Sequence, residues 1–169
     1  LVYISSNIFL YSQSFSLKGQ FWASGEYVEN QSDIISQIGY IPILSLLKSL
    51  DNNQLLDIEL SYRLDRVYFG DALENKIENF HRYWIRYSSN ELEARLGLQK
   101  IVFGPSQILR PLSWFDTIDL KDPTGQTDGV EAFRLRWFPS NYLSVWSWVI
   151  MNDQDTLSYG GRGELSTNH

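Results

Sequence analysis

Polar and apolar residues alternate with a period of two along most of this chain. In residues 56–65, every even position is leucine, isoleucine or tyrosine, and every odd position is charged or serine. Residues 15–27 and 91–99 follow the same alternation. Because successive side chains of a β-strand point to opposite faces, this pattern predicts strands with one apolar face and one polar face.

The number and length of these runs limit the possible architectures. Weaker runs cover residues 34–50, 80–88, 129–138, 142–151 and 159–165, which brings the expected total to about seven or eight strands of about ten residues. Soluble proteins favour strands of about five or six residues, whereas about ten residues are needed to cross a bilayer at a tilt. We therefore expect an all-β fold: an antiparallel transmembrane β-barrel, incomplete in this sequence, with an inserted loop rich in proline and aromatic residues.

Two short segments rich in serine and asparagine, residues 88–90 and 139–141, predict the turns of two hairpins. Residues 45–50 fit either a strand or a short helical turn. Simple alternation places Phe80 on the face of Arg82, and His81 on the face of Tyr83. The run from 142 to 151 is ambiguous, because one face would hold Tyr142, Trp146 and Trp148 while the other would hold Leu143, Val145 and Val149.

The two ends of the sequence have a different character from the middle. Residues 1–14 are apolar and small, which predicts the remnant of a secretory signal peptide with a cleavage region at residues 12–14. The alternative is an ordinary first strand. Residues 159–165 resemble a strand that has just begun, so we expect residues 15–169 to be the N-terminal part of a single barrel domain.

The polar faces of the expected strands carry more arginine than lysine. Arginine-rich faces with interleaved carboxylates suit fixed, partly shielded networks, so we expect them to line a water-filled lumen. The expected pore-lining residues are Arg82, Arg86, Arg95, Arg134, Arg136 and Arg162. The apolar positions, represented by Ile58, Leu60, Leu96 and Leu98, are expected to contact lipid. The alternative for the charged faces is plain exposure to solvent.

Composition argues against several other functions. A net charge of −6 and the lack of a basic run argue against nucleic acid as a partner. The chain has no cysteine, and its two histidines lie far apart in the sequence, so we expect neither a catalytic centre, nor a metal site, nor a cofactor. A carboxylate pair such as Asp57 and Glu59 suits a polar face better than acid–base catalysis.

One segment, residues 95–138, carries a resemblance to a known family. It resembles the outer-membrane porin-like barrels of Gram-negative bacteria, especially those of the Bacteroidetes and Chlorobi type. The matching residues are Arg95, Gly97, Gln99, Phe103, Gly104, Leu109, Arg110, Pro111, Leu112, Trp114, Phe115, Asp116, Asp122, Pro123, Asp128, Gly129 and Val130. The resemblance implies the N-terminal portion of a larger barrel.

The same segment contains the inserted loop. Three prolines exclude it from a central ladder, and long loops of this kind are often functional. We expect it to form a constriction across the lumen, in which the charged side chains pair with arginines of the strands. The constriction residues would be Arg110, Trp114, Asp116, Asp119 and Asp122. The alternative is an extracellular loop with solvated charges.

The sequence therefore predicts a channel of the bacterial outer membrane for passive or weakly selective passage of small hydrophilic solutes. Its partners would be outer-membrane lipid and those solutes, with anions favoured by the arginines; the oligomeric state is left open. Two alternatives remain. One is a soluble, exported, lipocalin-like barrel that binds an apolar ligand, and the other is an outer-membrane barrel enzyme whose catalytic pair lies in further sequence.

Overall fold

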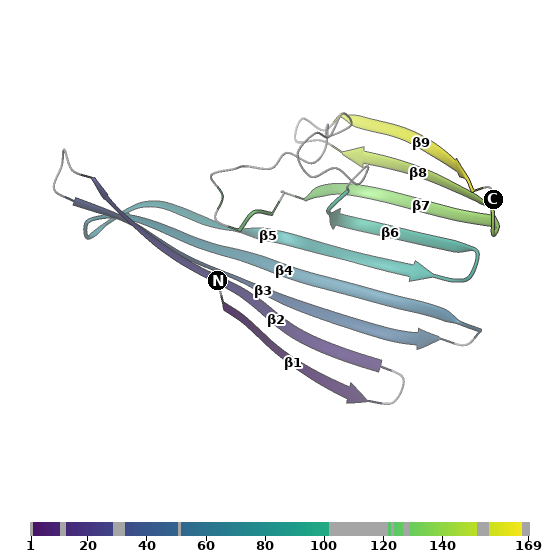
Figure 1. Ribbon diagram of the computed structural model, residues 1–169, viewed down its shortest axis with the longest axis horizontal. Coiled ribbons are helices and arrows are strands. Elements are labelled where there is room, and N and C mark those ends of the chain that lie inside the picture. Colours follow the sequence, from purple (N-terminus) through teal and green to yellow (C-terminus); the bar gives the residue numbers. More distant parts are fainter. Residues whose placement is uncertain are drawn as a thin grey trace.

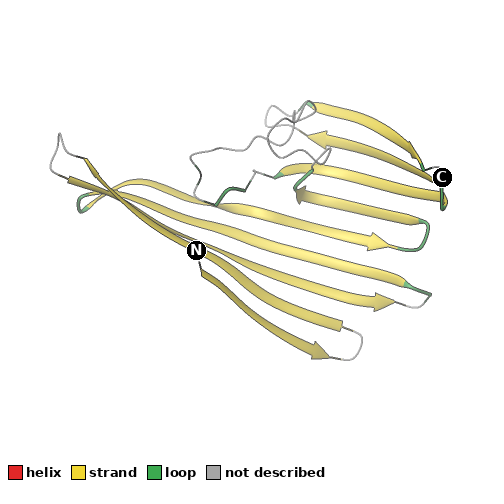
Figure 2. Cartoon of the chain, viewed as in Figure 1, coloured by secondary structure: helices red, strands yellow, loops and turns green. Residues whose placement is uncertain are grey.

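A single antiparallel sheet forms the described part of this computed structural model, which comprises residues 2–10, 13–28, 33–50, 52–101, 122, 124–126, 129–151 and 156–166. All of its regular structure is β-strand (Figure 2). The nine strands pair with their neighbours in chain order (Figure 1). Their bounds are Val2–Leu10 (β1), Gln13–Val28 (β2), Asp33–Leu50 (β3), Gln54–Phe69 (β4), Ala72–Ser88 (β5), Leu92–Gln99 (β6), Val130–Ser140 (β7), Leu143–Met151 (β8) and Leu157–Leu165 (β9).

The expected all-β, antiparallel fold is confirmed. Eight of the described strands, β2 to β9, correspond to runs predicted from the alternation. The ninth, β1, lies in the segment expected to be a leader, where the structure has the alternative, an ordinary strand paired with β2. Removal of a leader stays a prediction. The sheet is open, because β1 and β9 each pair on one side only, and closure into a barrel also stays a prediction. No helix in these ranges is long and apolar enough to cross a membrane.

Residues 45–50 are strand, so the helical-turn alternative is wrong. Ser45 pairs with Ser16 of β2 on one side and with Glu59 of β4 on the other. A central strand satisfies its backbone groups through two ladders at once. That gain outweighs the weak local preference of a six-residue segment.

The strands differ in length, and the longer strands project beyond the shorter ones at one end of the sheet. β2 to β5 contain 16 to 18 residues, well beyond the expected ten or so, whereas β6 to β9 contain 8 to 11. In Figure 1 the long strands extend past the ends of the short ones on the left. The opposite end of the sheet holds the turns at residues 89–91 and 141–142 and the neighbouring ends of β1 to β4, and we call it the short-turn edge.

A β-bulge at His81 changes the face assignment of Phe80. Ser61 opposes Arg82 but Tyr62 opposes Phe80, so His81 is the extra residue. Directly opposed residues of an antiparallel pair share a face, and the bulge therefore moves Phe80 to the face of Tyr62. The expected grouping of Phe80 with Arg82 is wrong, because one extra residue reverses the alternation beyond it.

The two faces of the sheet have exposures opposite to those of a soluble protein. On the apolar face, Leu60 is 43% exposed and Leu96 is 55% exposed. On the polar face, Asp65 is 1% exposed and Arg63 is 7% exposed. Charged residues are rarely buried unless they are paired, so Arg63 and Asp65 require partners on the polar face.

Candidate functional site

The polar face brings together all six arginines expected to line a pore. The register places each of them opposite a residue of that face. Arg82 opposes Ser61, Arg86 opposes Asp57 and Arg95, Arg134 opposes Arg95 and Trp148, Arg136 opposes Glu93 and Trp146, and Arg162 opposes Trp146. The alternation therefore assigned these residues to one surface, whereas their role in a pore stays a prediction.

Carboxylates lie between these arginines at ion-pair distance. Arg86 Nη2 donates to Asp57 Oδ2 at 2.6 Å, and Arg134 Nη2 donates to Glu93 Oε1 at 2.8 Å. Glu93 Oε2 lies 3.8 Å from Arg136 Nη1 and 3.9 Å from Arg86 Nη1. Glu93 is thus shared by three guanidinium groups, which is a network rather than a set of separate pairs.

Tryptophans on the same face stack against the guanidinium groups. The guanidinium carbon of Arg95 lies 4.3 Å from the ring centroid of Trp84, and that of Arg136 lies 4.0 Å from the ring centroid of Trp146. Such cation–π contacts contribute about 0.5 to 2 kcal/mol, most where water is excluded. They also decide the ambiguity of β8, since Trp146 and Trp148 lie on the polar face opposite Arg136 and Arg134.

Two of the tryptophans lie over glycines of the neighbouring strand. A Cβ at Gly39 would lie 2.1 Å from the ring of Trp22, and a Cβ at Gly160 would lie 2.6 Å from the ring of Trp148. These glycines leave the space that the flat indoles occupy. Trp22 is buried and carries the guanidinium of Arg63 5.4 Å above its ring.

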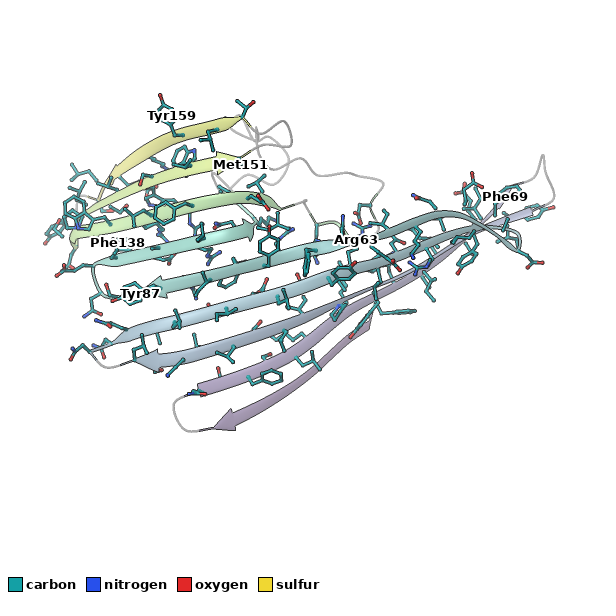
Figure 3. The ribbon with its side chains drawn as sticks, turned by 180° about the vertical axis from the view of Figure 1, so that it is seen from behind. Arg63, Phe69, Tyr87, Phe138, Met151 and Tyr159 are labelled. Carbon is teal, nitrogen blue, oxygen red and sulfur yellow. The ribbon has the colours of Figure 1, made fainter. Side chains whose placement is uncertain are left out.

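Part of the inserted loop docks on the polar face, near the middle of the long strands. We call Asp122 and residues 124–126 the docked segment. Asp122 accepts a hydrogen bond from Arg63, whose other terminal nitrogen donates to Asp65 at 2.9 Å. Gln126 lies 2.7 Å from the Nε2 atom of His81 and donates to Gln20. Figure 3 places Arg63 between the tip of the projecting strands at Phe69 and the short-turn edge near Tyr87 and Phe138.

The Asp122 carboxyl also organises the docked segment itself. Its Oδ1 atom accepts hydrogen bonds from the backbone N–H of Thr124 at 2.8 Å and from the Thr124 hydroxyl at 2.7 Å. Burial opposes ionisation of Asp122, but the hydrogen bonds from Arg63 and Thr124 outweigh it, so the pKa of this carboxyl is lowered. The ionised form is therefore the one that docking stabilises.

Of the five residues expected in a constriction, Asp122 lies against strand residues of the polar face. The other four, Arg110, Trp114, Asp116 and Asp119, lie outside the described residues. The described part of the loop contacts Gln20, Arg63 and His81 of the strands. Its role as a constriction across a lumen stays a prediction.

Sequence reasoning missed the residues that receive the docked segment. Arg63 and Gln20 stand at polar positions of clear strands, so alternation placed them on the correct face without indicating a partner. Simple alternation assigned His81 to the apolar face. The β-bulge makes this assignment wrong, and the sequence does not indicate the bulge, since positions 79–82 contain neither glycine nor proline.

The apolar face is bounded by aromatic rings and then by ion pairs. Phe80 makes edge contacts with Tyr62 and Tyr83, with ring centroids 5.3 and 5.6 Å apart. Farther along the projecting strands, Glu78 pairs with Arg66 and, at 2.7 Å, with Lys76. At the other end, Trp137 opposes Val145 on the apolar face and is exposed beside the short-turn edge. The apolar residues thus form a band between two rims, and we call it the apolar band.

Comparisons with protein-family models, curated proteins and solved structures found no match. The resemblance to porin-like barrels stays a prediction from the sequence. In the described ranges, no group of three or more histidine, aspartate or glutamate side chains is placed to hold a metal ion.

Proposed function

We propose that this chain is part of a membrane-spanning β-barrel of the outer-membrane kind, whose polar face lines a water-filled passage for small hydrophilic solutes. The observation that carries the proposal is the reversed exposure of the two faces. Among the described residues, Leu60 and Leu96 are two of 21 large hydrophobic side chains that are exposed. A continuous exposed apolar surface of this extent is typical of a membrane or protein contact rather than of contact with water.

The apolar band has the form that a bilayer requires. Transmembrane barrels carry an outward apolar band about 25 Å tall between aromatic girdles. Here the band on β4 runs from Leu56 to Leu64, roughly 26 Å along the strand at about 3.3 Å per residue, which is roughly 20 Å in height at a strand tilt of about 40°. It is followed by the ion-paired Arg66, which is suited to the headgroup region and to water.

The connections support one orientation of the sheet. Outer-membrane barrels have short turns on the periplasmic side and longer loops outside. The short-turn edge would therefore face the periplasm, whereas the projecting strands and the connection at residues 100–129 would lie on the outer side.

A lipocalin-like barrel fits these observations less well. Such a barrel fills its interior with apolar side chains or with an apolar ligand. The face that buries its side chains here is the one with Arg63 and Asp65, and it also receives the docked segment.

Two serine-to-cysteine variants test the proposal, because the sequence contains no cysteine of its own. Ser147 opposes Leu135 on the apolar face, and Ser158 opposes Ile150 on the polar face. The complete protein that contains this chain is expressed in a Gram-negative host. We expect it in the outer-membrane fraction, with Ser158→Cys labelled by a membrane-impermeant maleimide and Ser147→Cys labelled only by a lipid-soluble one. Recovery in the soluble fraction, with both variants labelled at the same rate by the impermeant reagent, would contradict the proposal.

A further inference from the structure

Three arginines lie side by side across neighbouring strands near the short-turn edge. Arg86 of β5 directly opposes Arg95 of β6, and Arg95 directly opposes Arg134 of β7. Like charges placed directly opposite each other in a sheet repel and destabilise it. With Arg136, which shares Glu93 with Arg134, they form what we call the arginine cluster.

The central member of the cluster, Arg95, makes no direct ion pair with the carboxylates around it. Asp57 pairs with Arg86, and Glu93 is shared by Arg86, Arg134 and Arg136. Arg95 has no ion pair with any residue that the structure describes, and its contact is the ring of Trp84. Four guanidinium groups thus face the two paired carboxylates and Glu59, whose carboxylate interacts electrostatically with Arg95. One positive charge is therefore in excess in this part of the polar face.

Hydrogen-bond donors of the cluster are also unused. The Nε atoms of Arg86, Arg95, Arg134 and Arg136 are buried without a hydrogen-bond partner in the described part of the protein. A buried donor without an acceptor costs about 1 to 3 kcal/mol. An acceptor outside the described residues, such as an anion bound in the passage, would satisfy these donors.

The stacking of Arg95 suits it to a planar or tetrahedral oxyanion. Trp84 covers one face of the guanidinium and leaves its edge N–H groups for hydrogen bonds in the guanidinium plane. Guanidinium edges match the oxygen spacing of carboxylates and phosphates, to which they donate two parallel bonds. Chloride, which has one centre, cannot use that geometry.

The arginine cluster is separate from the docked segment. Asp57 and Arg63 are six residues apart on β4, which corresponds to roughly 20 Å. Asp57 marks the cluster and Arg63 holds the docked segment. The cluster therefore lies closer to the short-turn edge than the site where the loop approaches the strands.

We propose that the cluster of Arg86, Arg95, Arg134 and Arg136 is a binding site for the oxyanion group of a small solute, a phosphate or a carboxylate. The inference rests on the proposed function, since it places the site on the wall of the passage. An anion bound at Arg95 would relieve the repulsion within the row and satisfy its free donors. The site would concentrate anionic solutes at one end of the passage despite the net charge of −6.

The test measures binding without requiring conductance. The purified complete protein in detergent micelles is titrated with inorganic phosphate in a calorimeter, and then with phosphate in the presence of acetate or of chloride. We expect saturable binding that acetate weakens more than chloride does. Arg95→Gln should weaken phosphate binding about tenfold or more, since it removes a charge-assisted donor pair. Arg95→Lys keeps the charge but lacks the two parallel N–H donors of a guanidinium, so its phosphate affinity should lie between those of wild type and Arg95→Gln. This variant also tests the site if Arg95→Gln does not fold.

Arg66→Gln is the matched control. It removes the same charge from an exposed arginine that pairs with Glu78 in the projecting strands, and it should change the phosphate affinity less than about twofold. Equal affinity in wild type, Arg95→Gln and Arg95→Lys would overturn the site, as would equal competition by chloride and acetate. Planar-bilayer recordings separate the two proposals. Binding without conductance would overturn the channel alone, and conductance with unaltered binding in Arg95→Gln would overturn the site alone.

Discussion

Replacing Leu96 by arginine measures which solvent the apolar face meets. Leu96 is 55% exposed and lies near the middle of the apolar band on β6. On one side, Leu92 opposes Trp137 at the rim beside the short-turn edge. On the other side, Leu98 opposes Glu131, which accepts a hydrogen bond from Tyr83. This position would therefore lie close to the bilayer midplane.

The two possible solvents predict different costs for this change. Arginine at the midplane of a transmembrane barrel costs about 2 to 4 kcal/mol, and near the interface about 0 to 1 kcal/mol. A surface substitution on a water-exposed face changes stability by about 0.5 kcal/mol or less. We expect Leu96→Arg to cost about 2 to 4 kcal/mol relative to Leu96→Ala. Leu143→Arg, beside the short-turn edge, should cost no more than about 1 kcal/mol relative to Leu143→Ala.

The assay is reversible urea unfolding of the complete protein in phospholipid vesicles, followed by tryptophan fluorescence. The alanine variants remove the same leucine packing, so the difference isolates the transfer of the charge. If Leu96→Arg and Leu143→Arg have equal costs within about 0.5 kcal/mol, the depth argument fails and the apolar band does not face lipid.

Two further predictions concern the polar face. Gly39→Ala should destabilise the protein by about 1 to 3 kcal/mol, because the added Cβ would overlap the ring of Trp22. The control in the same unfolding assay is Gly25→Ala, whose added Cβ has no atom within 4 Å. Equal costs for the two variants would show that the indole ring of Trp22 moves freely. Asp122→Asn should release the docked segment, detected as faster amide exchange at residues 124–126. Because the pKa of Asp122 is lowered in the folded protein, docking should be complete above the ordinary aspartate pKa and should be lost only as the pH falls through the lower, folded value. Loss of protection already at the ordinary value, or no change in Asp122→Asn, would refute the role of this carboxyl.

Much of the fold follows from local pattern alone. A strand places neighbouring side chains on opposite faces wherever it occurs, so the alternation in residues 56–65 and 91–99 determined both strands and both of their faces. The same property put Arg95 and Leu96 on opposite sides before any pairing was known. It also placed the six polar-face arginines on one surface.

Partners, in contrast, depend on register, and register is a property of two strands. The bulge that exchanges the faces of Phe80 and His81 exists only in the pairing of β5 with β4. The polar assignment of Trp146 required the pairing of β8 with Arg136 of β7. Residues 45–50 form a strand because they hydrogen-bond to β2 on one side and to β4 on the other. The sequence of these six residues alone does not contain that information.

The sequence by itself determined an all-β chain with one apolar and one arginine-rich face, because side-chain direction in a strand is local. Only the tertiary structure decided that Asp122 meets Arg63 across 59 residues, and that Arg95 lies between two other arginines without a direct ion pair of its own. The charges that surround a side chain come from several strands, so the sequence of one strand does not determine whether an arginine has a carboxylate partner.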